Sequence, residues 1–291
     1  MTDSPTVTVF SDIVCELGEG PSAHPLAGRL FWFDILNKRL FERPFDRTGT
    51  IIHDLPFHGT VAAAIDGGRQ LIAAETGFYV REIATNTVTL HTPHLADDTA
   101  TRTNDGRVHP AGALWVGTMG WDPAPERGAI WWFRKGEVRK LFDGIAIPNA
   151  ISFAPDGTHA YFSDTKVGTL YRVETDPATG LPTGEPKVFV SVTDGGPDGA
   201  VVDADGLLWN ARWGGGALDV YAPDGRRIRS IAIPAKQASC PCFFGPNADR
   251  LVVTSAHEGM DAAARAADPL AGQTFLVDLP VRGRFDPPVE L

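Results

Sequence analysis

Short apolar stretches separated by turn residues run along the whole chain. Typical examples are LFWFDI at 30–35, ALWVGTM at 113–119 and AYFSDT at 160–165, each followed by a turn and a second β-rich run. Stretches of this length, rich in β-branched and aromatic residues, are typical of strands. Met260–Ala267 (MDAAARAA) is the one helix-like window, and Asp268-Pro269 closes it. The pattern therefore predicts an all-β chain with one short helix in a connection.

An internal repeat organises these strands. A shift of 130 residues lays Leu30–Phe45 on Ala160–Thr175 without a gap, and further shifts reveal six copies, spaced roughly 40 to 50 residues apart, as propeller blades are. Their common position is occupied by Glu19, Gly59, Asn104, Asn149, Asp198 and Cys240. We predict a six-bladed β-propeller of four-stranded antiparallel blades, forming a single domain over residues 1–291. Val7–Phe10 is expected to complete the last blade by pairing with Thr274–Val277.

Composition and charge narrow the classes of function. Hydrophobic residues make up 43% of the chain, which excludes disorder, and 31 glycines and 23 prolines fit a fold rich in turns. The net charge of −10 disfavours a nucleic-acid or anionic-membrane partner. No apolar stretch approaches the roughly 18 residues of a membrane span, and the N-terminus lacks a signal-peptide pattern. With three cysteines, too few for a disulfide framework, these features predict a cytoplasmic protein. We expect it to be a monomer.

The repeat also predicts where polar side chains gather. Equivalent positions in a propeller are related by rotation, so they form a ring at one mouth of the central channel. Four members of that ring carry side-chain oxygens, namely Glu19, Asn104, Asn149 and Asp198. Carboxylate and amide oxygens suit a hard cation. Each of these residues alone is more typical of a turn than of a site, and only their rotational equivalence favours a site.

Other motifs point to chemistry less clearly. Gly20–His24 resembles a nucleophile elbow but has the wrong fifth residue and no strand-to-helix context. His91 and His94 are interpreted as surface residues, because a metal pair at that spacing needs a helix. Cys240-Pro-Cys242 lacks the spacing of a zinc or redox motif. Most tryptophans fall within strand patterns and should pack blades, whereas Trp121 and Trp213 follow strands and fall where channel-mouth loops are expected.

The motifs at these positions resemble those of the regucalcin/gluconolactonase (senescence marker protein-30-like) family of six-bladed propeller lactonases. The resemblance runs from about Cys15 to the C-terminal PLAGQTF. It rests on Leu17-Gly-Glu-Gly-Pro21, Arg102-Thr-Asn-Asp-Gly106 followed by LWVGTM, Ile147-Pro-Asn-Ala-Ile151, Pro197-Asp-Gly199 and TSAHEGM. One departure is that several members carry an acidic residue after Gly-Thr-Met, where this chain has Gly120-Trp121-Asp122.

The resemblance implies a metal-dependent hydrolase that opens a sugar aldonolactone, a pentono- or hexonolactone, to the free acid. It implies one divalent ion held by Glu19, Asn149 and Asp198, with calcium, zinc, magnesium, manganese and Fe(II) all admissible. Arg102 and Asn104 fall on the residues that contact sugar hydroxyls. Asp198 is in addition a candidate general base.

Two other readings stay open at this point. One is a calcium-binding or protein-docking propeller without catalysis. The other is a phosphotriesterase- or aryl-esterase-like propeller hydrolase, which would share the metal geometry but favour a more apolar pocket. The Arg102 and Asn104 pair favours a polyol substrate over these alternatives.

Overall fold

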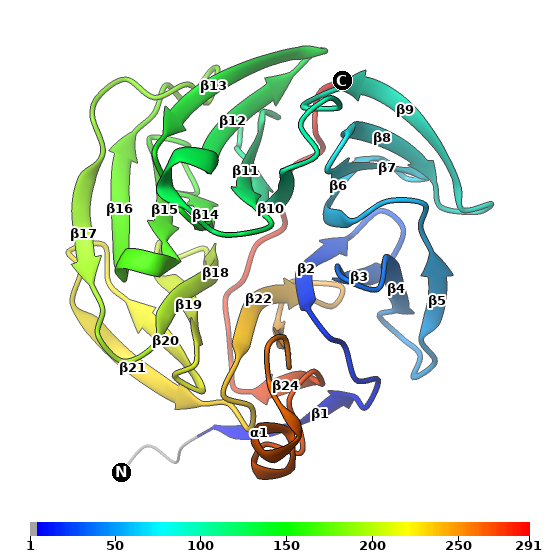
Figure 1. Ribbon diagram of the computed structural model, residues 1–291, viewed down its shortest axis with the longest axis vertical. Coiled ribbons are helices and arrows are strands. Elements are labelled where there is room, and N and C mark those ends of the chain that lie inside the picture. Colours follow the sequence, from blue (N-terminus) through cyan, green and yellow to red (C-terminus); the bar gives the residue numbers. More distant parts are fainter. Residues whose placement is uncertain (1–4) are drawn as a thin grey trace.

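Six four-stranded antiparallel sheets are arranged around a central axis in the computed structural model, which describes residues 5–291 (Figure 1). The innermost strands of the six blades are β2 (Gly18–His24), β6 (Gly59–Asp66), β10 (Thr101–Val108), β14 (Pro148–Phe153), β18 (Gly196–Val202) and β22 (Ala238–Phe244). Each contacts the innermost strand of the next blade, and β22 contacts β2, so the ring closes. The predicted six-bladed propeller is confirmed.

The remaining strands continue each blade outward. The second strands are β3 (Arg29–Asp34), β7 (Arg69–Ala74), β11 (Leu114–Gly120), β15 (His159–Asp164), β19 (Leu208–Trp213) and β23 (Arg250–Ser255). The third strands are β4 (Arg39–Pro44), β8 (Gly77–Glu82), β12 (Ala129–Arg134), β16 (Thr169–Glu174), β20 (Ala217–Tyr221) and β24 (Thr274–Asp278). The outermost strands are β5 (Ile51–Asp54), β9 (Thr87–Pro93), β13 (Glu137–Asp143), β17 (Lys187–Ser191), β21 (Arg227–Ala232) and β1 (Thr6–Ser11).

The last blade joins the two ends of the chain. Strand β1 pairs antiparallel with β24, with Val7 opposite Val277 and Val9 opposite Phe275. This confirms the predicted closure. The predicted helix is also present as α1 (Ala262–Ala267), capped by the Asp261 carboxylate, and two 3₁₀ turns occupy Pro125–Arg127 and Thr165–Val167. No helix among residues 5–291 is both long and apolar enough to span a membrane.

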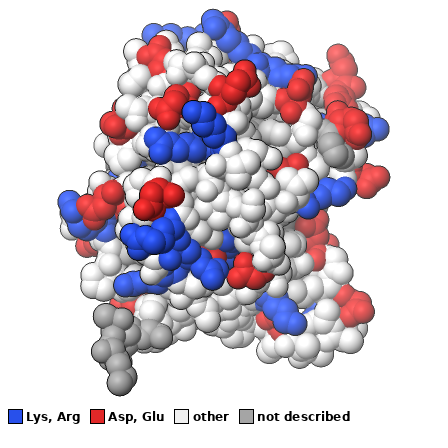
Figure 2. Space-filling model, turned by 90° about the vertical axis from the view of Figure 1, so that its left-hand side faces the viewer, with Lys and Arg blue, Asp and Glu red and all other residues white. Residues whose placement is uncertain are grey.

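Aromatic and branched side chains fill the space between neighbouring blades. Four of the five tryptophans within strand patterns, Trp32, Trp115, Trp132 and Trp209, are at most 5% exposed. Their packing role is therefore confirmed. Acidic and basic side chains are interspersed on the face shown in Figure 2, on the side of β17 and β21.

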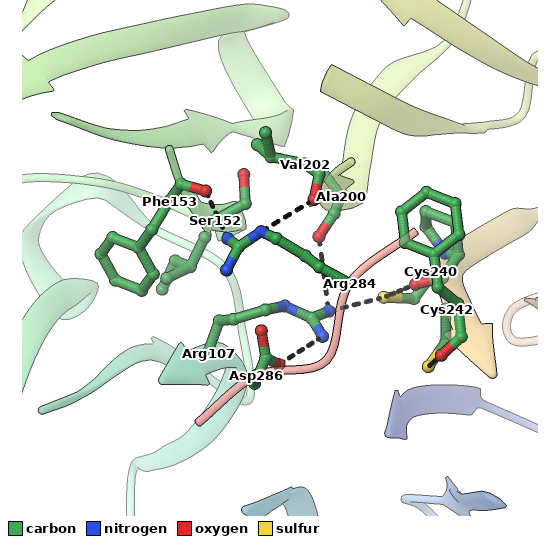
Figure 3. Close-up of polar contacts among 12 residues, drawn as sticks. Arg107, Ser152, Phe153, Ala200, Val202, Cys240, Cys242, Arg284 and Asp286 are labelled. Atoms are coloured by element: carbon green, nitrogen blue, oxygen red, sulfur yellow. Dashed lines mark hydrogen bonds and ion pairs between the residues drawn. The ribbon is translucent and has the colours of Figure 1, made fainter. Parts of the chain in front are cut away.

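A C-terminal segment, residues 279–291 and here called the strap, runs across the centre of the ring (Figure 1). It contacts the blades where the innermost strands finish. Arg284 donates to the carbonyl oxygens of Val202 at 3.1 Å and Phe153 at 2.5 Å (Figure 3). The Val289 amide donates to Ala64 at 2.8 Å. Two small cavities of about 20 Å³ each lie beside the strap.

Arg107 connects the strap to the channel interior. Its Nη1 lies 3.1 Å from Asp286 Oδ2 in the strap, and its Nη2 donates to Ala200 and contacts the Cys240 sulfur at 3.9 Å (Figure 3). Burial alone would lower the pKa of Arg107, but the charges of Asp286 and the thiol and carboxyl groups around it raise that pKa. The strap therefore supplies the main counter-charge to a buried guanidinium.

We predict that Asp286→Asn lowers the free energy of unfolding. Breaking a fully buried ion pair costs about 3–5 kcal/mol, and we expect a smaller loss, about 2–3 kcal/mol, because Asp286 is 28% exposed. Denaturant unfolding would measure the change. Glu137→Gln, which removes the exposed pair with Arg139, is the matched control and should leave stability unchanged. Equal effects of the two substitutions would contradict the role given to Arg107.

Candidate active site

Glu19 and Asn149 occupy the same place in two blades. Each is the last residue paired with the second strand before a β-bulge, Glu19 opposite Phe33 and Asn149 opposite Ser163. The next residue has a positive φ in both blades, 53° at Gly20 and 55° at Ala150. A Cβ at position 20 would collide with the Thr60 carbonyl oxygen, so only glycine fits there. The bulge turns both polar side chains toward the channel mouth.

A carboxylate clamp precedes each of these residues. At the end of β3, Asp34 accepts the backbone N–H groups of Glu16 at 3.1 Å and Leu17 at 3.2 Å. At the end of β15, Asp164 accepts those of Ala146 at 3.0 Å and Ile147 at 3.2 Å. The two clamps are 130 residues apart, which is the shift at which the sequence repeat was found. The repeat thus encodes the local geometry that aims Glu19 and Asn149.

Asn104 and Asp198 depart from this equivalence by one residue. In β10 and β18 the last paired residues before the bulge are Thr103 and Pro197, so Asn104 and Asp198 are the first residues within the bulge. The ungapped alignment had placed Asn104 and Asp198 at the same position as Glu19. The strand pairing corrects this placement by one residue. An ungapped comparison cannot distinguish the two positions, because both lie beside an unpaired residue of the bulge.

The two remaining ring members lie apart from the cavity. A Cβ at Gly59 would meet Phe33 at 2.8 Å and Ile72 at 3.1 Å, so this position faces the core between blades and not the channel, as the rotational argument expected. Cys240 is fully buried next to Gly199, where an added Cβ would collide with the cysteine side chain. Burial, followed by the charges of Glu19 and Asp105, raises the pKa of the Cys240 thiol.

A cavity of about 460 Å³ opens at the end of the channel where the innermost strands begin. It contains every residue that the sequence singled out for the site. Its lining is Leu17, Glu19, Leu36, Arg102, Asn104, Met119, Trp121, Pro123, Ile147, Asn149, Thr165, Asp198, Trp213, Gln237, Glu258 and Gly259. Trp121 and Trp213 therefore lie at the channel mouth as expected, whereas the exposed Asp122 is outside the lining.

The cavity concentrates negative charge. Burial raises the pKa of Glu19 to about 8, opposed by a hydrogen bond from the Gly20 amide and reinforced by the charge of Asp105. Burial and the charge of Glu19 likewise raise the pKa of Asp198, which is 3% exposed. The charge of Glu19 is thus close enough to destabilise the ionised form of Asp198.

Arg102 supplies positive charge beside this cluster. It is 5% exposed, and burial lowers its pKa while the carboxyl groups of Glu258, Glu19 and Asp198 raise it. Its Nη1 donates to Thr103 O at 2.9 Å and Asn104 Oδ1 at 2.8 Å. The guanidinium is therefore fixed in place, with its fork beside the carboxyl groups.

A hydrogen-bond chain orients the amide of Asn149. Thr165 Oγ1 donates to Pro197 O at 2.9 Å, so it accepts from Asn149 Nδ2 at 2.8 Å. The Asn149 oxygen is thereby turned to the other side, where it accepts from Asn104 Nδ2 at 2.9 Å. Because Asn104 Nδ2 also donates to Pro148 O at 3.1 Å, both of its donor positions are used. Asn104 supports Asn149 as well as facing the cavity.

The sequence reasoning missed Thr165 and Glu258. Thr165 follows the second strand of its blade and touches the site only because β15 is folded back beside β14. Glu258 lies in the TSAHEGM motif, and burial raises its pKa while Arg102 lowers it. The motif was noticed, but nothing in its spacing indicated which of its residues faces the cavity.

The weaker candidate motifs do not assemble a second site. His24 contacts Arg69 O and accepts from the Ala27 amide, so it is not positioned as a base for Ser22. The three cysteines are buried and unpaired. His91 is exposed as expected, but His94 is only 8% exposed, which corrects its interpretation as a surface residue. Its ring packs between Phe78 of one blade and Trp131 of the next.

The donor set fits a divalent cation. Two carboxylates and an amide oxygen are hard donors, and a bound cation would stabilise the ionised forms that burial disfavours at Glu19 and Asp198. Within residues 5–291, no three His, Cys, Asp or Glu side chains gather closely enough to hold a metal alone. The predicted set therefore depends on the oriented amide of Asn149.

Comparison with known proteins identifies the family. Residues 17–257 match the SMP-30/Gluconolactonase/LRE-like region. The chain belongs to the SMP-30/gluconolactonase/LRE-like family. A Rhizobium meliloti (strain 1021) protein provisionally named a sugar lactone lactonase is 50% identical over 97% of this chain and 96% of its own length. Pentonolactonase XacC of Haloferax volcanii is 34% identical over 96% of both chains.

A solved structure of this family resembles the chain throughout. The calcium-binding protein regucalcin of Agrobacterium tumefaciens superposes with a TM-score of 0.95 at 46% identity, covering 99% of this chain and 98% of that one. The family resemblance inferred from the motifs is therefore confirmed over nearly the full length. The clamps and bulges described above give these motifs a physical role in this chain, since they position Glu19 and Asn149.

We predict that Thr165→Val weakens the binding of a divalent cation. The substitution keeps the shape of the side chain but removes the oxygen that holds Asn149 Nδ2, so the amide loses its fixed orientation. Loss of such a supporting hydrogen bond typically costs about 10–100-fold in metal affinity. Calorimetric titration with calcium and manganese would measure it. Thr165→Ser, which keeps the hydroxyl, is the matched control, and wild-type affinity in the valine variant would contradict the orienting role.

Proposed function

We propose that this protein hydrolyses sugar lactones, opening a pentono- or hexonolactone to the free aldonic acid. The observation that carries the proposal is the cavity in which Glu19, Asn149 and Asp198 face Arg102, in a chain 34% identical to a pentonolactonase over almost its full length. A cavity of about 460 Å³ has room for a single sugar ring. We propose that residues 1–291 form one propeller domain that carries this activity.

In this proposal, Glu19, Asn149 and Asp198 hold one divalent cation. When bound, such a cation supplies Lewis-acid polarisation of an ester carbonyl and stabilisation of the oxyanion that forms on it. The crowding of carboxyl groups supports this assignment, since burial raises the pKa of both Glu19 and Asp198 and the charge of Glu19 raises the pKa of Asp198 further. Calcium, zinc, magnesium, manganese and Fe(II) are all compatible with oxygen ligands, so the identity of the metal stays a prediction.

Arg102 and Asn104 are proposed to bind the substrate. The Arg102 guanidinium already gives Nη1 to Asn104, so its remaining N–H groups are those available to lactone hydroxyls. Asn104 offers only its amide oxygen to the substrate, because both Nδ2 protons are used. Glu258 lines the same cavity and carries a charge opposite to that of Arg102, and it supplies a further acceptor for hydroxyl groups.

Asp198 is proposed to act as the general base. Its carboxylate takes a proton from the attacking water as the water oxygen bonds to the lactone carbonyl carbon. The ring C–O bond then breaks, and the proton passes to the departing ring oxygen, which becomes a hydroxyl of the open acid. The strap closes the opposite end of the channel, so substrate and product use the same mouth.

The polar lining favours this function over the alternatives. The buried arginine, which makes two hydrogen bonds within the site and faces three carboxyl groups, suits a substrate with several hydroxyls better than the apolar groups of an aryl ester or a phosphotriester. A purely calcium-binding module would need no open cavity beside the ligands. A cytoplasmic location and a monomeric state stay predictions from the sequence.

We predict that removing the metal abolishes lactone hydrolysis and that restoring a divalent cation recovers it. Glu19→Gln and Asp198→Ala should each lose metal affinity together with turnover, because each removes a charged ligand. Turnover of a panel of pentono- and hexonolactones, an aryl ester and a phosphotriester would be measured with metal content on the same samples. Asp122→Asn is the control, because Asp122 follows Trp121 in the sequence but lies outside the cavity lining. Full activity in metal-free protein would contradict the metal-dependent mechanism.

We predict that Arg102→Lys raises KM or lowers kcat/KM for sugar lactones while metal content stays unchanged. Lysine keeps the charge but loses the planar fork that reaches two acceptors at once. Initial-rate kinetics and metal analysis would be run in parallel. If the variant instead loses its metal, Arg102 acts through Asn104 on Asn149 and the assignment to substrate is wrong.

A further inference from the structure

Trp121 stands out among the exposed apolar side chains of the protein. It is 42% exposed, and among the large hydrophobic side chains exposed within residues 5–291 it is the only aromatic one and the only one that lines the active-site cavity. It directly follows β11, and its backbone amide donates to Ala100 O at 3.1 Å. An indole left open at this position needs a reason beyond packing.

Two neighbouring side chains contact the indole ring. The Arg102 guanidinium carbon lies 5.6 Å from the Trp121 ring centroid. The His58 imidazole lies 4.8 Å from it, at an interplanar angle of 70°. Contacts of both kinds favour a fixed ring orientation. Trp121 therefore contacts Arg102, the residue proposed to bind substrate hydroxyls.

His58 is itself fixed by Glu75 through two hydrogen bonds. The His58 amide donates to Glu75 Oε2 at 2.8 Å, and His58 Nδ1 lies 2.9 Å from Glu75 Oε1. His58 precedes β6 and Glu75 follows β7, so both belong to the blade beside that of Trp121. The side chains are about one-fifth exposed, and the pair braces a tryptophan from the neighbouring blade.

We propose that Trp121 is a specificity-determining residue, a stacking platform for the C–H face of the substrate ring, held in place by His58 and Glu75. A sugar lactone ring carries hydroxyls on its edges and C–H groups on its faces. Arg102 with Asn104 and Glu258 can satisfy the hydroxyls, whereas the indole offers the apolar surface that the C–H face needs. The inference rests on the proposed lactonase function and adds the element that recognises the ring itself.

The test measures sugar-lactone kinetics for Trp121→Ala, Trp121→Phe and His58→Ala. We expect the alanine variant to raise KM about tenfold with kcat changed less than about threefold, and phenylalanine to restore most of the loss. His58→Ala should raise KM in the same direction by a smaller factor, because the platform stays but loses its brace. Leu26→Ala, an exposed apolar residue outside the cavity, is the control.

Three measurements, namely the kinetic constants, the metal content and Tm, separate the outcomes. Metal content and Tm measured on every variant show whether the fold and the metal site are intact. Wild-type protein that hydrolyses no sugar lactone overturns the proposed function, and the platform with it. Active wild-type protein with an unchanged KM in a folded, metal-loaded Trp121→Ala variant overturns the platform alone. A kcat loss without a KM change would also overturn it, because stacking on the ground-state ring acts on binding.

Discussion

The burial of two like charges is the constraint on which the rest of the structure depends. Glu19 and Asp198 face one cavity, and burial raises the pKa of both carboxyl groups. Two such groups stay ionised together only beside positive charge. Arg102 lies on one side of them, and the proposed metal would supply the larger part. This explains why a six-bladed ring is a suitable scaffold, since its innermost strands bring side chains from distant parts of the chain to one axis.

The channel is organised along its length by a succession of charges. Below the cavity, Asp105 accepts the Ile151 amide at 2.8 Å, and burial raises its pKa. Arg107 follows, held by Asp286 of the strap at 3.1 Å. The strap thereby has two consequences, since it closes one end of the channel and it neutralises a guanidinium that balances the acidic interior. The site consequently has a single mouth, around which specificity can be arranged.

Precision at that mouth comes from residues that touch no ligand. The Asp34 and Asp164 clamps set the approach to Glu19 and Asn149, and Thr165 selects which face of the Asn149 amide meets the cavity. Asn104 connects that amide to Arg102, so the proposed metal and substrate groups share one hydrogen-bond network. A change at Asp34, Asp164 or Thr165 is expected to act on the site through geometry and not through chemistry.

The sequence by itself determined the blade count, the closure by β1 and the residues that meet in the cavity, because a repeat of fixed length specifies rotation about an axis. It could not determine which residue within each bulge faces inward, since neighbouring positions differ only in pairing that forms after folding. For this reason Asn104 and Asp198 were placed one position off and Gly59 was assigned to the channel. His94 was assigned to the surface because its packing between Phe78 and Trp131 joins two blades and leaves no local pattern. Thr165, Glu258 and the His58–Glu75 brace were decided by tertiary structure alone, because their contacts join different strands or blades and leave no local pattern in the chain.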